Sequence, residues 1–111
     1  MRITKADVIQ TAADIADKNG LSNVSLKAVA ESLNIRTPSL YNHIDSLEAL
    51  LREIAHNGMK TMNERMMQAA IGKIGDNAIK SVGITYLNYM IEHPGIYETI
   101  QWATWHGTEE T

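Results

Sequence analysis

The feature that most constrains this fold is an apolar repeat in steps of three and four residues, which runs from Leu47 to Ala70. Such a repeat places its apolar side chains on one face of an α-helix, whereas a half-buried strand needs alternation at every second residue. No stretch of the chain sustains that alternation, and helix-forming residues are common throughout. The sequence therefore predicts an all-α fold.

Capping signals divide the chain into six predicted helices. Thr4 with Asp7 resembles a capping box, and Ser25 and Thr37 are each expected to cap a short helix. Asp45 begins a further capping-box pattern ahead of the long helix. Gly58 lies inside that helix and costs about 1 kcal/mol relative to Ala, so we expect a bend there. The predicted helices span residues 5–19, 26–32, 37–44, 46–71, 76–92 and 94–105.

Composition excludes several classes of protein. The 111 residues include no cysteine, which rules out a disulfide scaffold and thiolate chemistry, and no apolar run approaches the ~18 residues of a membrane span. The N-terminus passes straight into an amphipathic pattern, so we expect no secretory signal and a cytoplasmic protein. No two of the four histidines have metal-ligand spacing, and no nucleophile motif or phosphate loop occurs. We expect no metal, no cofactor and no enzymatic activity.

The net charge of −3 is distributed unevenly. Residues 1–44 carry five basic and four acidic groups, whereas residues 45–111 carry five basic and nine acidic groups. For a nucleic-acid partner the distribution of charge matters more than its sum. The acidic excess therefore does not exclude a DNA contact made by the first part of the chain.

The second and third predicted helices are short and joined by a tight link, which favours a helix-turn-helix. Asn34 in the link tolerates positive φ. Leu40 and Ile44 are predicted to face inward. The opposite side would enter a major groove, where Arg36 can pair a guanine and Asn42 an adenine. The outward residues of the second short helix are Arg36, Thr37, Ser39, Asn42 and His43.

The run from Ser25 to Ile44 resembles the DNA-binding signature of the tetracycline-repressor-like (TetR) family. Its most specific elements are Leu40-Tyr41 followed by His43, and then Glu48-Ala49-Leu50-Leu51. The resemblance implies a helix-turn-helix DNA-binding domain over residues 1–55. It also implies an incomplete helical regulatory and dimerisation region over residues 56–111.

The resemblance also implies roles for single residues. Ser25 would bind a phosphate, Lys27 a base or a phosphate, and Tyr41 and His43 the DNA backbone, although Tyr41 is equally suited to the edge of the core. The floor of the groove would be read by Arg36, Thr37, Pro38 and Ser39. The sequence departs from the family at three positions: Asn34 replaces the usual Gly, Ile44 the usual Phe or Val, and Leu47 a frequent phosphate-binding Lys. The last change removes one phosphate contact and predicts modest affinity.

The second half carries a shorter match. Glu92 to Tyr97 and the triplet Trp105-His106-Gly107 resemble the C-terminal body of one branch of the family. Family members are usually much longer and dimerise through their last two helices. Because the chain ends at Thr111, we expect a fragment or a truncated product.

The apolar side chains of the second half leave two interpretations open. The methionines at three- and four-residue steps suit plain core or an adhesive interface, and they also suit a ligand wall. Candidate ligand-binding residues are Met59, Met62, Met66, Tyr86, Tyr89 and Trp102. We expect Met62, Met66, Tyr86, Tyr89, Trp102 and Trp105 to stay partly uncovered and to form a homodimer interface through the last two helices.

Two functional hypotheses follow. The first is a ligand-responsive repressor that binds double-stranded DNA through the helix Thr37–His43 and answers to a small-molecule effector. The second is a truncated helical interaction module that oligomerises and has lost productive operator binding.

Overall fold

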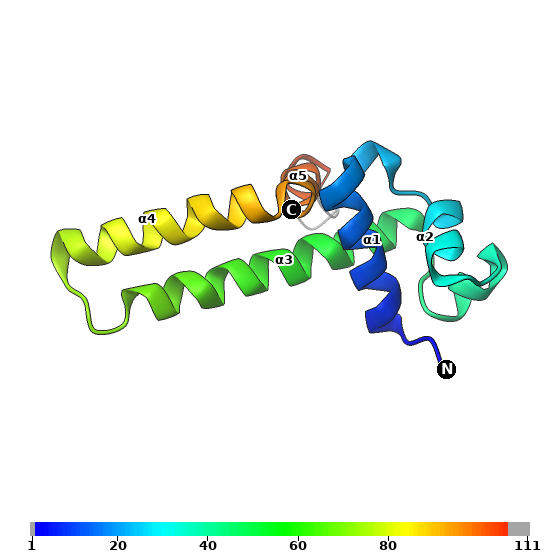
Figure 1. The fold of residues 1–111 in the computed structure, drawn as a ribbon, viewed down its shortest axis with the longest axis horizontal. Coiled ribbons are helices and arrows are strands. Elements are labelled where there is room, and N and C mark those ends of the chain that lie inside the picture. The colour runs from blue at the N-terminus through cyan, green and yellow to red at the C-terminus, as the bar shows by residue number, and fades with distance from the viewer. Residues whose placement is uncertain (1, 107–111) are drawn as a thin grey trace.

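The computed structural model describes residues 2–106, and all regular structure within that range is helical (Figure 1). The elements are α1 (Lys5–Asn19), η1 (Leu21–Asn23), α2 (Leu26–Leu33), η2 (Thr37–Asn42), α3 (Leu47–Ala70), α4 (Gly75–Glu92) and α5 (Pro94–Trp105). The all-α prediction is confirmed. Gly107 of the Trp-His-Gly triplet lies outside the described residues.

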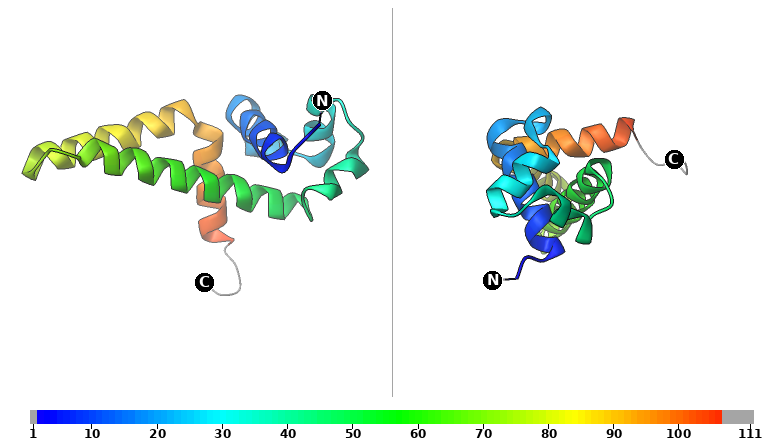
Figure 2. Two further views of the ribbon diagram at one scale, coloured as in Figure 1. Left: turned by 90° about the horizontal axis from the view of Figure 1, so that it is seen from below. Right: turned by 90° about the vertical axis from the view of Figure 1, so that its right-hand side faces the viewer.

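The molecule is elongated, with principal extents of 52 × 34 × 22 Å. α3 and α4 run antiparallel as a long hairpin, and α1, α2 and η2 gather at one end of it (Figures 1 and 2). α5 crosses α3 where the hairpin meets α1. We call residues 4–54 the N-terminal bundle, and α3 beyond residue 54 together with α4 the hairpin.

Local capping explains where most helices begin. Asp7 N–H donates to Thr4 Oγ1 and Thr4 N–H to Asp7 Oδ2, which confirms the predicted capping box of α1. Gly20 follows α1 with φ of +92°, a conformation that suits glycine. Ser25 caps α2 as predicted, because its Oγ accepts the Ala28 N–H at 3.0 Å.

Two predicted caps are wrong. α3 is capped by Ser46, whose Oγ accepts the Ala49 N–H at 3.0 Å, and not by Asp45. The second error concerns Thr37, which lies inside η2 and does not cap it. The segment is also a 3₁₀-helix and not the α-helix expected; it is six residues long, and 3₁₀ geometry is found in short helical pieces.

The main core lies in the N-terminal bundle. Val8 and Ala12 of α1, Val29 of α2, Leu40 of η2 and Leu50 of α3 are fully buried in one cluster. A smaller cluster of Ala55, Tyr89 and Ile100 holds α3, α4 and α5 together. Ile96 packs against both clusters, so α5 connects the bundle to the hairpin.

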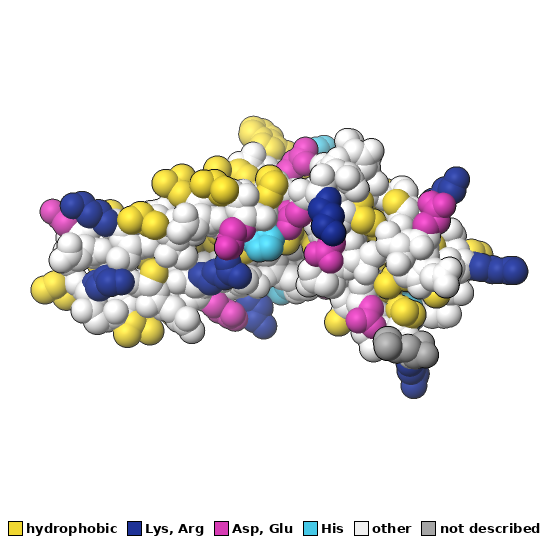
Figure 3. Space-filling view, in the orientation of Figure 1, with side chains coloured by type: hydrophobic (Ala, Val, Ile, Leu, Met, Phe, Trp, Pro, Cys, Tyr) yellow, Lys and Arg dark blue, Asp and Glu magenta, His cyan; other side chains and the backbone are white. Residues whose placement is uncertain are grey.

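α4 leaves an apolar stripe uncovered. Ile79, Leu87 and Ile91 are spaced at multiples of four residues, so they lie on one side of the helix, and all three are exposed. Apolar side chains line the outer edge of α4 in Figure 3. Trp105 at the end of α5 is 85% exposed. Tyr89, by contrast, is only 2% exposed, so the prediction that it stays partly uncovered is wrong.

Candidate nucleic-acid interface

The turn between α2 and η2 fixes the start of the candidate surface. Asn34 adopts the left-handed conformation, with φ of 58° and ψ of 43°, as its residue type allowed. The Ile35 N–H donates to the Ala30 carbonyl at 3.0 Å and closes the turn. Arg36 follows in extended conformation with an exposed side chain.

The 3₁₀ geometry of η2 sorts its side chains into rows, because residues three apart eclipse one another. Leu40 is 0% exposed and anchors the inward row, which also holds the half-buried Thr37 and His43. Ser39 and Asn42 share an exposed row, which Arg36 extends by the same spacing. The prediction that Leu40 and Ile44 face inward is confirmed. Thr37 and His43 were expected to face outward, but they share the row of Leu40 and are half-buried, because residues three apart lie on the same side of a 3₁₀-helix.

The remaining predicted residues surround these rows. Pro38 and Tyr41 form the third row and are exposed, Tyr41 to 56%, so Tyr41 is not part of the core. Lys27 is exposed in the first turn of α2, next to the cap residue Ser25. The Ser25 oxygen already accepts the Ala28 N–H, which leaves its hydroxyl hydrogen free to donate outward.

Some basic side chains near η2 are paired with a carboxylate and others are not. Lys5 pairs with Glu53 at 3.3 Å, and Arg52 pairs with Glu48 at 2.7 Å. Within residues 2–106, Lys27 and Arg36 form no ion pair. Their charges are therefore not offset by a contacting carboxylate.

Sequence reasoning missed Arg2, which lies beside η2 at this surface. Arg2 and Ile3 line a hollow of about 450 Å³ together with Ile35, Ser39, Asn42 and His43. Arg2 is exposed and forms no ion pair with any described residue. Its position ahead of α1 was visible in the sequence, but only the fold shows that this segment returns beside η2.

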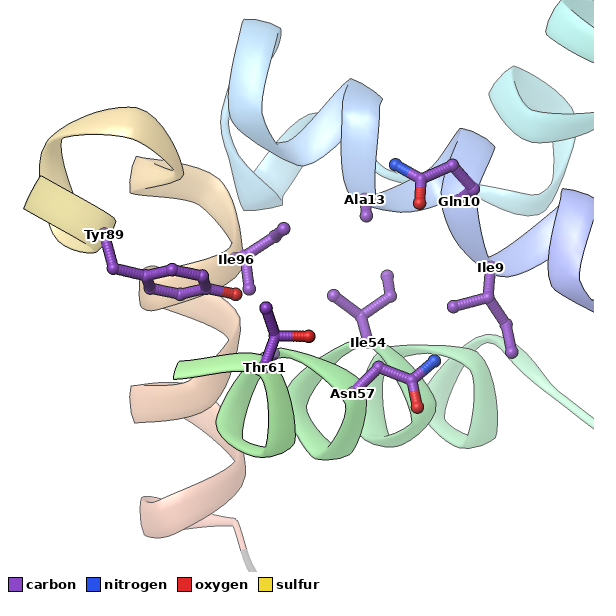
Figure 4. A pocket seen from close by; sticks show the side chains of 9 residues that line it. Ile9, Gln10, Ala13, Ile54, Asn57, Thr61, Tyr89 and Ile96 are labelled. Atoms are coloured by element: carbon purple, nitrogen blue, oxygen red, sulfur yellow. The ribbon is translucent and has the colours of Figure 1, made fainter. Parts of the chain in front are cut away.

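The predicted ligand-binding residues do not surround a common cavity. Among them, only Tyr89 lines the cleft of about 100 Å³ between α1, α3, α4 and α5 (Figure 4). Met59 lines a separate open hollow on α3, and Met62 packs against the small core cluster. Met66 is half-buried, the Tyr86 hydroxyl bonds to that of Tyr97 at 2.8 Å, and Trp102 stacks on His106.

The described residues offer little else of chemical interest. No group of three His, Asp or Glu side chains within residues 2–106 is placed to hold a metal ion. None of the described helices is long and apolar enough to span a bilayer.

Comparison with known proteins gives two relatives. The chain is 38% identical over 96 residues to YobS of Bacillus subtilis, an uncharacterised helix-turn-helix-type transcriptional regulator. It is 28% identical over 96 residues to Rv0681 of Mycobacterium tuberculosis, described in the same words. Each match covers 86% of this chain, but only 50% and 44% of the relatives, so the chain spans about half their length. No family model matches.

Proposed function

We propose that the chain is a DNA-binding transcriptional regulator of the TetR type that reads an operator half-site with the segment Thr37–His43. The observation that carries this proposal is the arrangement of η2. Leu40 anchors it in the core, while Arg36, Ser39 and Asn42 line up on its outer side. Similarity to two helix-turn-helix regulators supports the same function.

Each residue of the surface has a role that its chemistry supports. Arg36 donates two hydrogen bonds to a guanine edge, and Asn42 pairs with an adenine edge. Ser39 and Thr37 are small enough for close approach to the groove, beside Pro38. Phosphates are bound by Ser25, Lys27, Tyr41 and His43, which carry hydroxyl, ammonium or imidazole groups. Tyr41 is exposed on η2, His43 follows η2, and Ser25 and Lys27 lie at the start of α2.

The regulatory part of the proposal concerns the rest of the chain. We assign residues 1–55 to DNA binding and residues 56–111 to an incomplete regulatory and dimerisation region. A small-molecule effector acting on this region would make the protein a ligand-responsive repressor. The predicted ligand-binding set stays a prediction. Its members are dispersed, and Tyr89 is the one that lines the cleft between the helices, so Tyr89 is the favoured candidate. The set comprises Met59, Met62, Met66, Tyr86, Tyr89 and Trp102.

A homodimer is also part of the proposal, because helix-turn-helix proteins commonly read two half-sites related by two-fold symmetry. The exposed stripe of Ile79, Leu87 and Ile91 on α4 is the surface that supports it. Light scattering at micromolar concentration tests the dimer. Ile91→Glu should produce a monomer, while the matched change at exposed polar Asn88, Asn88→Glu, should not.

Selection of binding sites from random duplexes by the full chain tests the function itself. We expect an enriched sequence whose affinity falls linearly with the logarithm of salt concentration. Equal affinity for the selected and a scrambled duplex would contradict the proposal. That result, combined with a stable dimer, would favour the second hypothesis, a helical interaction module without operator binding. The exposed stripe on α4 supports that hypothesis as well.

A further inference from the structure

The contact between α1 and α5 involves a segment that the DNA-binding surface does not use. His93 precedes α5, and Gly95 and Ile96 lie in its first turn. All three contact Ala16 or Asp17 near the end of α1. α1 belongs to the N-terminal bundle, whereas α5 follows the hairpin (Figure 2). This segment is therefore a junction between the part that carries η2 and the rest of the molecule.

Asp17 of α1 makes the central polar contacts of the junction. Its Oδ1 accepts the Ile96 backbone N–H at 2.9 Å, and its Oδ2 lies 2.7 Å from His93 Nδ1. The Asp17 side chain is only 16% exposed. His93 precedes α5 but makes no side-chain capping bond of its own. Asp17 thus caps α5 from a different helix. It accepts a first-turn backbone N–H, which is the role that the side chain of the residue before a helix usually has.

The neighbouring residues allow these contacts. A Cβ at position 95 would overlap the backbone of Ala16, so only glycine lets α5 come this close to α1. Pro94 at the start of α5 has no N–H to satisfy, and the Ile96 N–H, which also lies in the first turn, is the donor to Asp17. Glu98 accepts the Leu21 N–H at 3.0 Å on the other side of the same contact.

A hydrogen bond also continues from α5 into the hairpin. The hydroxyl of Tyr97 on α5 lies 2.8 Å from that of Tyr86 on α4. One end of α5 is therefore bonded to α1 through Asp17 and to α4 through Tyr97. Motion of α4 relative to the bundle would have to strain or break one of these bonds.

We propose that Asp17 is a positioning residue, which by capping α5 holds α5 and α4 in place against the DNA-reading bundle, while α3 runs through both parts. The proposal rests on the proposed function only in assigning DNA reading to the bundle. The partly buried Ile96 amide loses its partner when the Asp17 carboxylate is removed, which loosens the first turn of α5 against α1.

The absence of cysteine makes a direct test simple, since two introduced cysteines are the only labelling sites. Ser32→Cys on α2 and Lys80→Cys on α4 place spin labels at exposed positions on the bundle and on the hairpin. Their distance distribution is measured by electron spin resonance in the full chain. Hydrogen exchange of the Ile96 amide is followed by NMR in the unlabelled protein.

Three variants separate positioning from general stability. Asp17→Ala should broaden the distance distribution and speed exchange of the Ile96 amide by about tenfold, equivalent to one lost hydrogen bond. Asp17→Asn keeps an oxygen for the Ile96 N–H and a side-chain amide toward His93, and should stay close to the wild type. The control is Asp14→Ala, one turn earlier, where the carboxylate is exposed and bonds only Gln10.

The outcomes decide the proposal. The proposal would be overturned if Asp17→Ala and Asp14→Ala had the same label distance distribution and the same exchange rate of the Ile96 amide. An Asp17→Asn variant as broad as Asp17→Ala would also overturn it, because the capping oxygen would then be irrelevant. In binding-site selection, Asp17→Ala should retain the base preference of the wild type. A failure of all variants to bind DNA would contradict the proposed function, but the label measurement would still decide the role of Asp17.

Discussion

Gly58 of α3 lies against Ile96 of α5 so closely that a Cβ at position 58 would stand 2.5 Å from Ile96 Cγ2. From the same added Cβ, Ile100 Cδ1 would lie at 3.2 Å and the Tyr89 hydroxyl oxygen at 3.3 Å. The glycine is thus required by the crossing of two helices. Its loss of helix propensity is offset by the packing it allows.

Gly58→Ala should therefore destabilise the protein by about 1–3 kcal/mol, because the β-branched Ile96 can move Cγ2 away only by leaving its preferred χ1 rotamer or by shifting its backbone. The control is Gly83→Ala in the middle of α4, where nothing lies within 4 Å of the added atom. That change should stabilise by up to about 1 kcal/mol through helix propensity. Chemical denaturation measures both, and a stabilised Gly58→Ala would show that the crossing adapts.

Leu40→Ala should reduce the free energy of unfolding by about 2–5 kcal/mol, since Leu40 is fully buried in the main core. Tyr41→Ala at the neighbouring exposed position should change it by about 0.5 kcal/mol or less. Thermal and denaturant unfolding test the pair. An unchanged midpoint in Leu40→Ala would show that the rows of η2 are wrongly assigned, and the outward assignment of Arg36 and Asn42 would fall with them.

Arg36→Ala should relax base preference at one position of the operator, at a cost of about 1–3 kcal/mol there. The measurement is a titration against the selected duplex and its single-base variants. Lys27→Ala provides the comparison, because a pure phosphate contact weakens binding to all sequences alike. If Arg36→Ala weakened binding to all duplexes equally, Arg36 would contact the DNA backbone, as expected for Lys27, and would not read a base.

Arg2→Ala should weaken binding to all sequences and lower the salt slope by about one, because the hollow beside η2 places its charge near the DNA backbone. Lys18→Ala is the matched control. Lys18 is exposed in the last turn of α1 and lines a different hollow, with Thr11 and Ser32. An Arg2→Ala slope equal to that of Lys18→Ala would remove Arg2 from the interface.

Alkaline pH should destabilise the fold through Tyr89. Burial raises the pKa of Tyr89, Asp17 raises it further, and Arg65 opposes the shift. The unfolded chain then loses this proton first, so the contribution of Tyr89 to stability is fully present below a pH of about 10 and is lost as the pH rises above it. Tyr89→Phe should make the decline shallower in denaturation measured between pH 8 and 11. An unaltered decline would show that Tyr89 does not contribute to it.

The sequence by itself determined the parts of the fold that depend on local interactions. The start of α1 follows from the Thr4–Asp7 box and its end from Gly20, and the start of α5 follows from Pro94 at its first position. The left-handed Asn34 and the inward Leu40 were likewise predictable from residue type and apolar spacing. In each case the partners lie within a few residues, so the pattern contains the information.

The tertiary structure decided what depends on residues far apart in the chain. Gly58 was expected to bend a helix, and its function is to admit Ile96, 38 positions later. Tyr89 was expected at the surface, but α3 and α5 bury it. Arg2 beside η2 and Asp17 beneath α5 carried no local signal. Their roles arise only when the helices pack. Asp17 then meets the α5 amide that it caps, and the charge of Arg2 is brought beside η2, and sequence spacing reveals neither pairing.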